Sequence, residues 1–269
     1  MREKLILTGR IVFAIAIAGV GFQQFYDADF HPMILPPLHE WIPFKAFWAY
    51  VTGIAFFVFA GCVVFQKKGR TASLILGGVL LAIFCLYYIP YEIIVDPYYK
   101  HLGSWGNAEK ELALAGGVFV IAGSFAIQGE KVHNKFSWLR TLEKLISLGG
   151  IFFSITMISF GVDHLLYTEG ISTLVPSWIP GKIFWTYFAA VALIGSGISI
   201  VFKIWVKIIA TLLGTMIFLW FIFLHIPRAV EMPFAETGNE VTSAFSALAF
   251  SGIAFVIAGC HSKTKSIIS

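Results

Sequence analysis

Apolar segments that are long enough, or nearly long enough, to cross a lipid bilayer recur along the whole chain. They cover about residues 5–25, 46–66, 72–90, 112–128, 145–166, 183–202, 207–226 and 242–260. About 20 apolar residues in a helix span the hydrocarbon core, and backbone polar groups in lipid must be satisfied within the segment. The sequence therefore predicts an all-α membrane protein with eight transmembrane helices. The fourth segment is short by this measure, and an extension back towards Glu109 is left open.

Composition supports the membrane class, since 58% of the 269 residues are hydrophobic and the mean hydropathy is +0.83. Both values exceed those of soluble globular domains. The net charge of +4 says little about partners, because in a membrane protein the division of charge between the two sides matters more. We expect the lipid bilayer as a partner, and no nucleic acid.

The charges divide unequally between the two ends of the predicted helices. Of the nineteen Lys and Arg residues, only five fall at one end, together with twelve of the fifteen acidic residues. Those five are Lys45, Lys100, Lys110, Lys182 and Arg228. The basic end of a bacterial membrane protein usually faces the cytoplasm, which predicts that both termini are cytoplasmic.

An internal duplication is visible in the stretch WIPFKAFWAY (41–50), which returns as WIPGKIFWTY (178–187). The correspondence continues on both sides: Gly9…Gly21 aligns with Gly149…Gly161, Ile89-Pro90 with Ile226-Pro227, and FVIAG (119–123) with FVIAG (255–259). Each unit holds four predicted helices, an even number, so the two units have the same orientation and form a parallel repeat. We expect a first repeat at 1–128, a basic cytoplasmic linker at 129–144 and a second repeat at 145–269.

Polar residues gather where the odd-numbered segments end on the acidic side. His164 and His225 lie at similar depths in the fifth and seventh segments, and ionisable residues near a membrane core are candidates for a binding site. A plain interfacial role and a polar pocket both remain open. The ligand-binding candidates are Asp163, His164, Lys182, His225, Arg228 and Glu231, with Gln24, Lys45, Tyr88 and Glu92 as first-repeat counterparts.

The repeated lysines stand in the first turn of their predicted helices, against the helix dipole. Either Lys45 and Lys182 extend to the membrane surface, or each helps a helix N-terminus to hold an anion or a carboxylate. Asp163 is the best partner for Lys182, and on that basis Lys182→Met should do more harm than Lys45→Met.

The sequence gives little support for a haem or a metal ion as a cofactor. Two histidines at one depth also fit haem ligation, but the pattern is too sparse to predict a haem. The spacings that bind structural or catalytic metals do not occur, so we expect no metal. His31, His39 and His101 fall in predicted external loops, where we expect them to be solvated.

The runs "GVDHLLY…LVPSWIPGKIFWTYFAAVALIGSGISI" and "FIFLHIPRAVE…NEVTSAFSALAFSGIAFVIAG" make the second repeat similar to the DoxX-like family of bacterial integral membrane proteins. The first repeat is a degenerate copy, in which Gln24 and Tyr88 replace histidines. The resemblance implies a four-helix membrane unit in the bacterial inner membrane, and it implies function only loosely. It adds Trp178, Pro180, Trp185, Tyr187 and Pro227 to the candidate residues, with Trp48 as the counterpart of Trp185.

Two functions follow as hypotheses. The first is a small-molecule-binding or lipid-binding protein, or a partner subunit of a membrane complex, with no catalysis of its own. The second, suggested by the resemblance, is a membrane subunit of a quinone-linked oxidoreductase that acts on a reduced small molecule. In the second case Asp163, His164 and His225 would bind or protonate the quinone headgroup, and Lys182 or Arg228 would stabilise negative charge. The sequence leaves open whether the protein is an enzyme.

Overall fold

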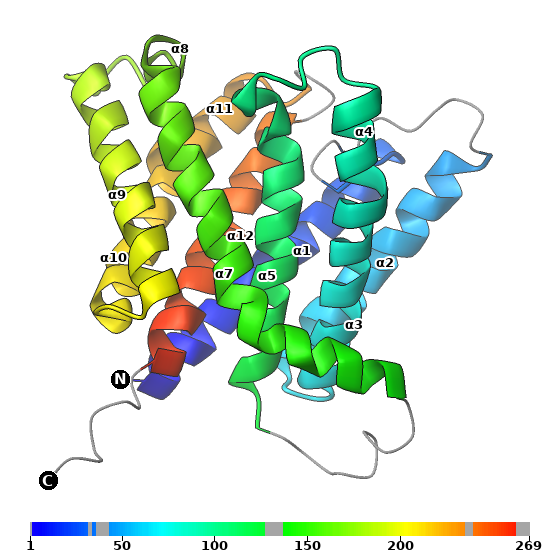
Figure 1. Cartoon of the computed structure of the whole chain (residues 1–269). Coiled ribbons are helices and arrows are strands. Elements are labelled where there is room, and N and C mark those ends of the chain that lie inside the picture. The colour runs from blue at the N-terminus through cyan, green and yellow to red at the C-terminus, as the bar shows by residue number, and fades with distance from the viewer. Residues whose placement is uncertain (1, 32–33, 36–42, 127–136, 235–238, 262–269) are drawn as a thin grey trace, which may run out of the picture.

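The computed structural model describes residues 2–31, 34–35, 43–126, 137–234 and 239–261, which form helices joined by short loops and contain no strand (Figure 1). In chain order the helices are α1 (Arg2–Asp27), α2 (Lys45–Val64), α3 (Gly69–Ile83), the π-helix η1 (Phe84–Tyr88), α4 (Ile89–Ile94), the 3₁₀-helix η2 (Leu102–Trp105), α5 (Gly106–Ser124), α7 (Ser137–Leu166), α8 (Thr168–Ser172), α9 (Lys182–Phe202), α10 (Val206–Trp220), the π-helix η3 (Phe221–His225), α11 (Ile226–Glu231) and α12 (Asn239–Cys260).

Seven helical stretches of the described chain are long and apolar enough to cross a membrane, which supports the predicted class of all-α membrane protein. They are Arg2–Asp27, Lys45–Val64, Gly69–Ile94, Trp138–Leu166, Lys182–Phe202, Val206–Glu231 and Asn239–Cys260.

Helix α5 is the exception, because three consecutive charged residues stand near its start. It covers 106–124 rather than 112–128: it begins before Glu109, as the open extension allowed, and ends four residues earlier than predicted. The helix begins among charged residues because it is enclosed by other helices, and Glu111 lies inside the protein rather than in lipid.

The helix contacts form a closed cycle, in the order α1, α2, α3, α5, α7, α9, α10 and α12, with α12 returning to α1. α5 and α12 also touch across the middle, and most of their residues are buried. The pairs α1–α12 and α5–α7 join the two halves of the chain. The first helix of each predicted repeat therefore packs against the last helix of the other.

Close approach in both of these pairs depends on glycine. A Cβ atom added to Gly9 of α1 would lie 2.6 Å from the carbonyl oxygen of Gly252 of α12. A Cβ atom added to Gly149 of α7 would lie 2.6 Å from the carbonyl oxygen of Gly116 of α5. Small residues allow helix backbones to meet in this way in membrane proteins.

Several backbone features recur at the 137-residue spacing of the repeated motif. The π-helices η1 and η3 end at Tyr88 and His225, and each is followed by a proline, Pro90 or Pro227. Proline lacks the N–H of a regular helical hydrogen bond, so a widened turn at this place has a physical cause. Left-handed residues recur at the same spacing, as the pairs Phe44 and Gly181, Gln66 and Lys203, and Lys68 and Trp205.

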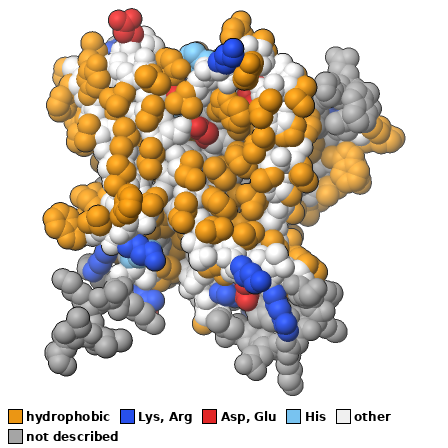
Figure 2. Space-filling model, viewed as in Figure 1, with side chains coloured by type: hydrophobic (Ala, Val, Ile, Leu, Met, Phe, Trp, Pro, Cys, Tyr) orange, Lys and Arg blue, Asp and Glu red, His pale blue; other side chains and the backbone are white. Residues whose placement is uncertain are grey.

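The two ends of the bundle differ in charge. The end that carries the N-terminus and the turns at 65–68 and 203–205 gathers Lys and Arg side chains, and we call it the basic end (Figure 2). The opposite end, where α4, α7 and α11 finish, is called the acidic end. The first turns of α7 run across the basic end before the helix bends towards α8 (Figure 1).

The first turns of α7 are attached to the bundle by both apolar and ionic contacts. Leu139 packs with Leu74 of α3 and Phe119 of α5, and Glu143 pairs with Arg70 at 2.9 Å. Residues 137–144 of the expected linker are thus part of α7, and residues 129–136 lie outside the described residues.

Candidate functional site

The sequence Glu109-Lys110-Glu111 lies near the start of α5, at the acidic end of the bundle. Successive residues of an α-helix point about 100° apart. The three side chains therefore face different neighbours: Glu109 faces α7, Lys110 faces α12, and Glu111 faces the η1–α4 segment. These three side chains, together with the polar side chains that they face, form a layer inside an otherwise apolar bundle, which we call the polar layer.

The Glu109 face contains two acidic side chains close to each other. Ser159 of α7 donates a hydrogen bond to Glu109 Oε1, and Thr156 donates another to the Glu109 carbonyl oxygen at 2.8 Å. Asp163, one turn further along α7, is only 8% exposed and interacts electrostatically with both Glu109 and His101. Glu109 Oε2 and Asp163 Oδ1 are buried and have no hydrogen-bond partner among the described residues.

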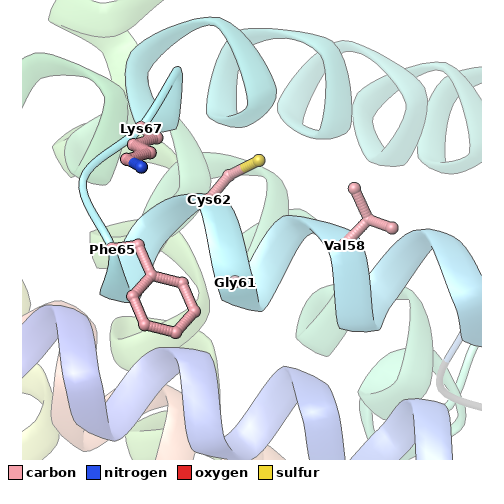
Figure 3. Close-up of a pocket in the computed structure, with 5 residues that line it drawn as sticks. All are labelled: Val58, Gly61, Cys62, Phe65 and Lys67. Atoms are coloured by element: carbon pink, nitrogen blue, oxygen red, sulfur yellow. The ribbon is translucent and has the colours of Figure 1, made fainter.

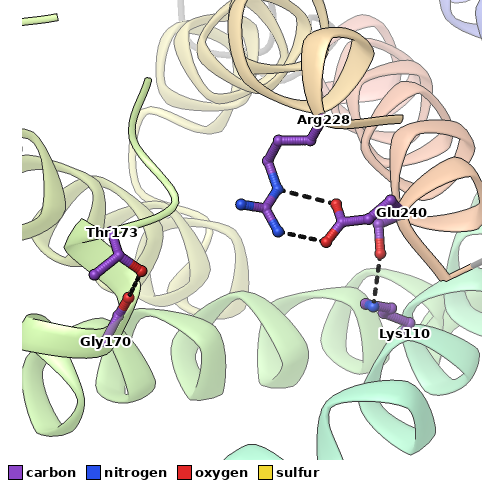
Figure 4. A network of polar contacts seen from close by, with 6 residues as sticks. Lys110, Gly170, Thr173, Arg228 and Glu240 are labelled. Atoms are coloured by element: carbon purple, nitrogen blue, oxygen red, sulfur yellow. Dashed lines mark hydrogen bonds and ion pairs between the residues drawn. The ribbon is translucent and has the colours of Figure 1, made fainter. Parts of the chain in front are cut away.

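The Lys110 face combines a cation with an ion pair. Lys110 Nζ lies 3.2 Å from Ser243 Oγ of α12. Beside it, Arg228 of α11 makes two hydrogen bonds to the carboxylate of Glu240, one of them 2.9 Å long from Nε to Oε2 (Figure 4). His225 lies within the electrostatic reach of these charges, and its Nδ1 atom is buried with no hydrogen-bond partner in the part of the chain that the structure describes.

The Glu111 face is the most deeply buried of the three. Glu111 has no exposed surface, and neither of its carboxylate oxygens has a hydrogen-bond partner within residues 2–31, 34–35, 43–126, 137–234 and 239–261. Tyr88, 1% exposed, interacts electrostatically with both Glu111 and Glu92, which is 4% exposed. Buried polar atoms in proteins are nearly always paired, so this acid is unusual.

The structure separates the second-repeat candidates into two groups. Asp163, His225 and Arg228 belong to the polar layer described above. The others make local or surface contacts: His164 is held by the carbonyl oxygen of Phe160 at 2.7 Å, and Trp185 donates to the carbonyl oxygen of Pro180 at 3.2 Å.

Glu231 and Lys182, two further candidates of the second repeat, lie outside the polar layer. Glu231 is exposed at the end of α11. Lys182, the first residue of α9, is half-buried and forms no ion pair with Asp163, so the expected pairing of these two residues is wrong. Asp163 points instead towards α5, because it faces the α5–α7 contact.

Among the first-repeat candidates, Gln24, Tyr88 and Glu92 are buried. Thr52 donates to Gln24 Oε1 at 3.0 Å, and Gln24 Nε2 is buried with no partner among the described side chains and backbone. Lys45 is half-buried at the start of α2, and Trp48 is 49% exposed, as an aromatic residue near a membrane surface would be.

The expected loop histidines also differ from one another. His31 is not solvated: it is 2% exposed, lies 3.0 Å from the carboxylate of Asp27 and 3.4 Å from the amide nitrogen of Gln23. The polar side chains that end α1 enclose it. His101 is exposed and stacks on Tyr167, with ring centroids 4.2 Å apart. His39 lies outside the described residues.

The central acids and their partners were missed as site residues. From the sequence alone, charged residues at the edge of an apolar segment are expected to lie in water at the end of the helix, and this applies to Glu109, Lys110, Glu111 and Glu240. A signal was present, because three consecutive charges precede a segment that is short for a transmembrane helix unless they are included in it.

The described residues contain no group of three or more His, Cys, Asp and Glu side chains suited to hold a metal ion. A separate hollow occurs towards the basic end, on α2 and the turn that follows it (Figure 3). It is lined by Val58, Gly61, Cys62, Phe65 and Lys67, which include none of the candidate residues.

Comparison of the chain with protein-family models, with curated proteins and with solved structures returns no match.

Proposed function

We propose that the chain is an inner-membrane protein of DoxX-like type, with eight transmembrane helices in two parallel four-helix repeats. The matching π-helices, left-handed residues and Gly–Gly contacts support the repeat. α5 is the eighth crossing in this proposal, since its charged residues meet protein rather than lipid. The basic end faces the cytoplasm.

We further propose that the protein binds a small molecule or lipid in the polar layer at the acidic end, where the ligand has an apolar body and a polar head. One observation carries this proposal: Glu109 Oε2, Asp163 Oδ1 and His225 Nδ1 are buried there and find no hydrogen-bond partner among the residues that the structure describes. Leaving such an atom unpaired costs about 1–3 kcal/mol. A bound head group that supplies hydrogen bonds would remove that cost.

The chemistry of these atoms limits the ligand. Carboxylate oxygens accept hydrogen bonds, and a neutral imidazole accepts through one ring nitrogen. The head group should therefore carry O–H or N–H donors. Lys110 and the Arg228–Glu240 pair add one net positive charge, which suits a head group that also has a carbonyl or phosphate oxygen. The apolar body would extend between the helices, in contact with lipid.

The test is to purify the protein in mild detergent and to identify the bound molecules by mass spectrometry. A specific ligand should be enriched over bulk lipid and depleted in Asp163→Asn and His225→Ala. Glu231→Gln is the matched control, since Glu231 is an exposed acid at the same end, and it should retain the ligand. Bulk lipid in identical proportions in all four proteins would refute the proposal.

The alternative is a quinone-linked redox subunit. It is favoured by the position of His225 and the carboxylates of Asp163 and Glu109 in one layer, since these groups, when protonated, can donate hydrogen bonds to a quinone and supply the two protons that it takes up on reduction. The two electrons would come from the reduced small molecule, through a partner subunit. Enriched quinone that is lost in Asp163→Asn and His225→Ala would support this function. Bulk phospholipid alone, with no chromophore in the optical spectrum, would rule out its cofactor-bearing form.

A further inference from the structure

The hollow on α2 lies on the outer surface of the bundle and extends along the helix. Val58, Gly61, Cys62 and Phe65 line it from α2, and Lys67 lines it from the turn that follows (Figure 3). The four α2 residues have the spacing i, i+3, i+4 and i+7, which places them on one side of the helix. At 1.5 Å per residue this stripe is about 10 Å long. The hollow therefore runs from the basic end towards the middle of α2.

The wall of the hollow is mostly apolar and faces outwards. Val58 and Phe65 are both exposed, and a Cβ atom added to Gly61 would meet nothing within 4 Å. α2 is long and apolar enough to cross a membrane, so the surroundings of this wall are lipid rather than water. A hydrocarbon chain is therefore the chemical group that fits the space over Gly61.

Positive charge stands at the basic end of this apolar wall. Lys67 is exposed there, and the exposed Lys68 follows it. Among the described residues neither lysine forms a salt bridge, whereas Arg70 in the next turn is paired with Glu143 at 2.9 Å. The residues that line the hollow include no acid. An anionic group that lies beside Lys67 would be attracted without competition from a neighbouring carboxylate in the wall.

The second repeat replaces both the space and the charge. At the 137-residue spacing, the counterparts of Gly61 and Lys67 are Ile198 and Ile204, and both isoleucines are exposed. The turn itself is kept, since its left-handed residues recur in the second repeat. The helix and the turn thus form with isoleucine at both places, so the fold does not require a glycine and a lysine there.

We propose that the hollow binds one anionic phospholipid of the membrane. One acyl chain lies over Gly61 along the stripe from Phe65 to Val58, and the headgroup phosphate lies beside Lys67. Lysine binds phosphate as a point charge, and lysines close to a membrane surface favour anionic lipids. This site is at the opposite end of the bundle from the polar layer, and it does not depend on the ligand proposed there.

The test is lipid binding to the purified full-length protein in detergent, measured by native mass spectrometry. Phosphatidylglycerol is the anionic probe, and phosphatidylcholine with the same acyl chains is the neutral one. The wild type should bind phosphatidylglycerol more tightly. Lys67→Gln should weaken that binding about fivefold and leave phosphatidylcholine unchanged, because only the charge is removed. Gly61→Ile, which introduces the residue of the second repeat, should weaken both lipids severalfold because it fills the hollow.

Matched variants in the second repeat control for general effects. Lys203→Gln removes an exposed lysine from the equivalent turn, and Gly195→Ile adds a side chain to another open helical glycine. Both variants, and Asp163→Asn in the polar layer, should bind the two lipids as the wild type does. Asp163→Asn thus separates a failure of this proposal from a failure of the ligand site. Equal affinities of the wild type for the two lipids, or equal losses in Lys67→Gln and Lys203→Gln, would overturn the proposal.

Cys62 reports the position of the lipid, because it lies in the wall of the hollow. In a protein with Cys85→Ser and Cys260→Ser, phosphatidylglycerol should slow the reaction of Cys62 with N-ethylmaleimide more than phosphatidylcholine does. Inorganic phosphate should give no protection, since it has no chain to cover the thiol. Equal protection by phosphate would indicate a simple anion site and overturn the lipid. Unprotected Cys62 in saturating phosphatidylglycerol would overturn the location.

Discussion

At the scale of single residues, equivalent positions in the two halves carry different chemistry. Gly19 of α1 is covered by the ring of Phe245 of α12, which lies where a Cβ atom would be. The aligned positions are Ser159 of α7 and Glu109 of α5, which meet through a hydrogen bond. An apolar contact between small and large side chains has thus been replaced by a polar one in the same helix pairing.

This correspondence predicts a compensation. Glu109→Phe alone should overpack the α5–α7 contact against Ser159 and destabilise the protein by about 1–3 kcal/mol. The double variant with Ser159→Gly should recover most of that loss, because it recreates the Gly19–Phe245 contact. Apparent melting temperatures in detergent for the single and double variants measure the coupling. Additive losses would show that the two contacts are not equivalent.

The paired lysines allow a second prediction at this scale. Lys45 and Lys182 each begin a helix, each is half-buried, and neither forms an ion pair in the described structure. Lys45→Met and Lys182→Met should therefore have small and similar effects, within about 0.5 kcal/mol. This replaces the expectation that Lys182 matters more. A clearly larger loss of stability or of bound ligand in Lys182→Met would restore the paired role.

At the scale of helices, the contacts between halves depend on glycines at matched places. The α1–α12 and α5–α7 pairs bring backbone carbonyl oxygens to within 3 Å of the position of a Cβ atom. Two other helical glycines, Gly61 of α2 and Gly195 of α9, face open space. The chain thus provides tight and open sites for the same substitution.

We expect Gly116→Ala and Gly252→Ala to lower the melting temperature strongly, because the new methyl group meets rigid backbone and the helices must separate. Gly61→Ala and Gly195→Ala should instead have no cost, and they should gain up to about 1 kcal/mol from helix propensity. Thermal unfolding of the four variants in one detergent measures the difference. Equal effects in all four would contradict the proposed close contact.

At the scale of the whole molecule, charge asymmetry makes the orientation testable. In a background with Cys62, Cys85 and Cys260 replaced by Ser, Glu169→Cys lies at the acidic end and Lys67→Cys at the basic end. A membrane-impermeant maleimide added to intact cells should label the first variant and spare the second until the membrane is opened. The reverse pattern would invert the proposed topology, as would an external location of an enzyme fused after Ser269.

The amino-acid sequence by itself determined the class of the protein, the approximate limits of most helices, the charge difference between the ends and the 137-residue correspondence. These properties depend on local or periodic patterns of residues, so they can be recognised in the sequence without the structure. Membership of Asp163, His225, Tyr88 and Glu92 in a polar layer was also anticipated in part, from their depth along the helices.

Only the tertiary structure decided which helix each polar side chain meets. Helices that are apolar on nearly all sides have no stripe that reveals their inward face, so the missing Lys182–Asp163 pair could not be foreseen. The sequence does not distinguish a buried acidic residue from a solvated one. Glu111 is buried and Glu231 is exposed because different residues surround them in the folded protein. The packing of α5 against α3, α7 and α12 provides those surroundings, and with them the chemistry at this end of the bundle.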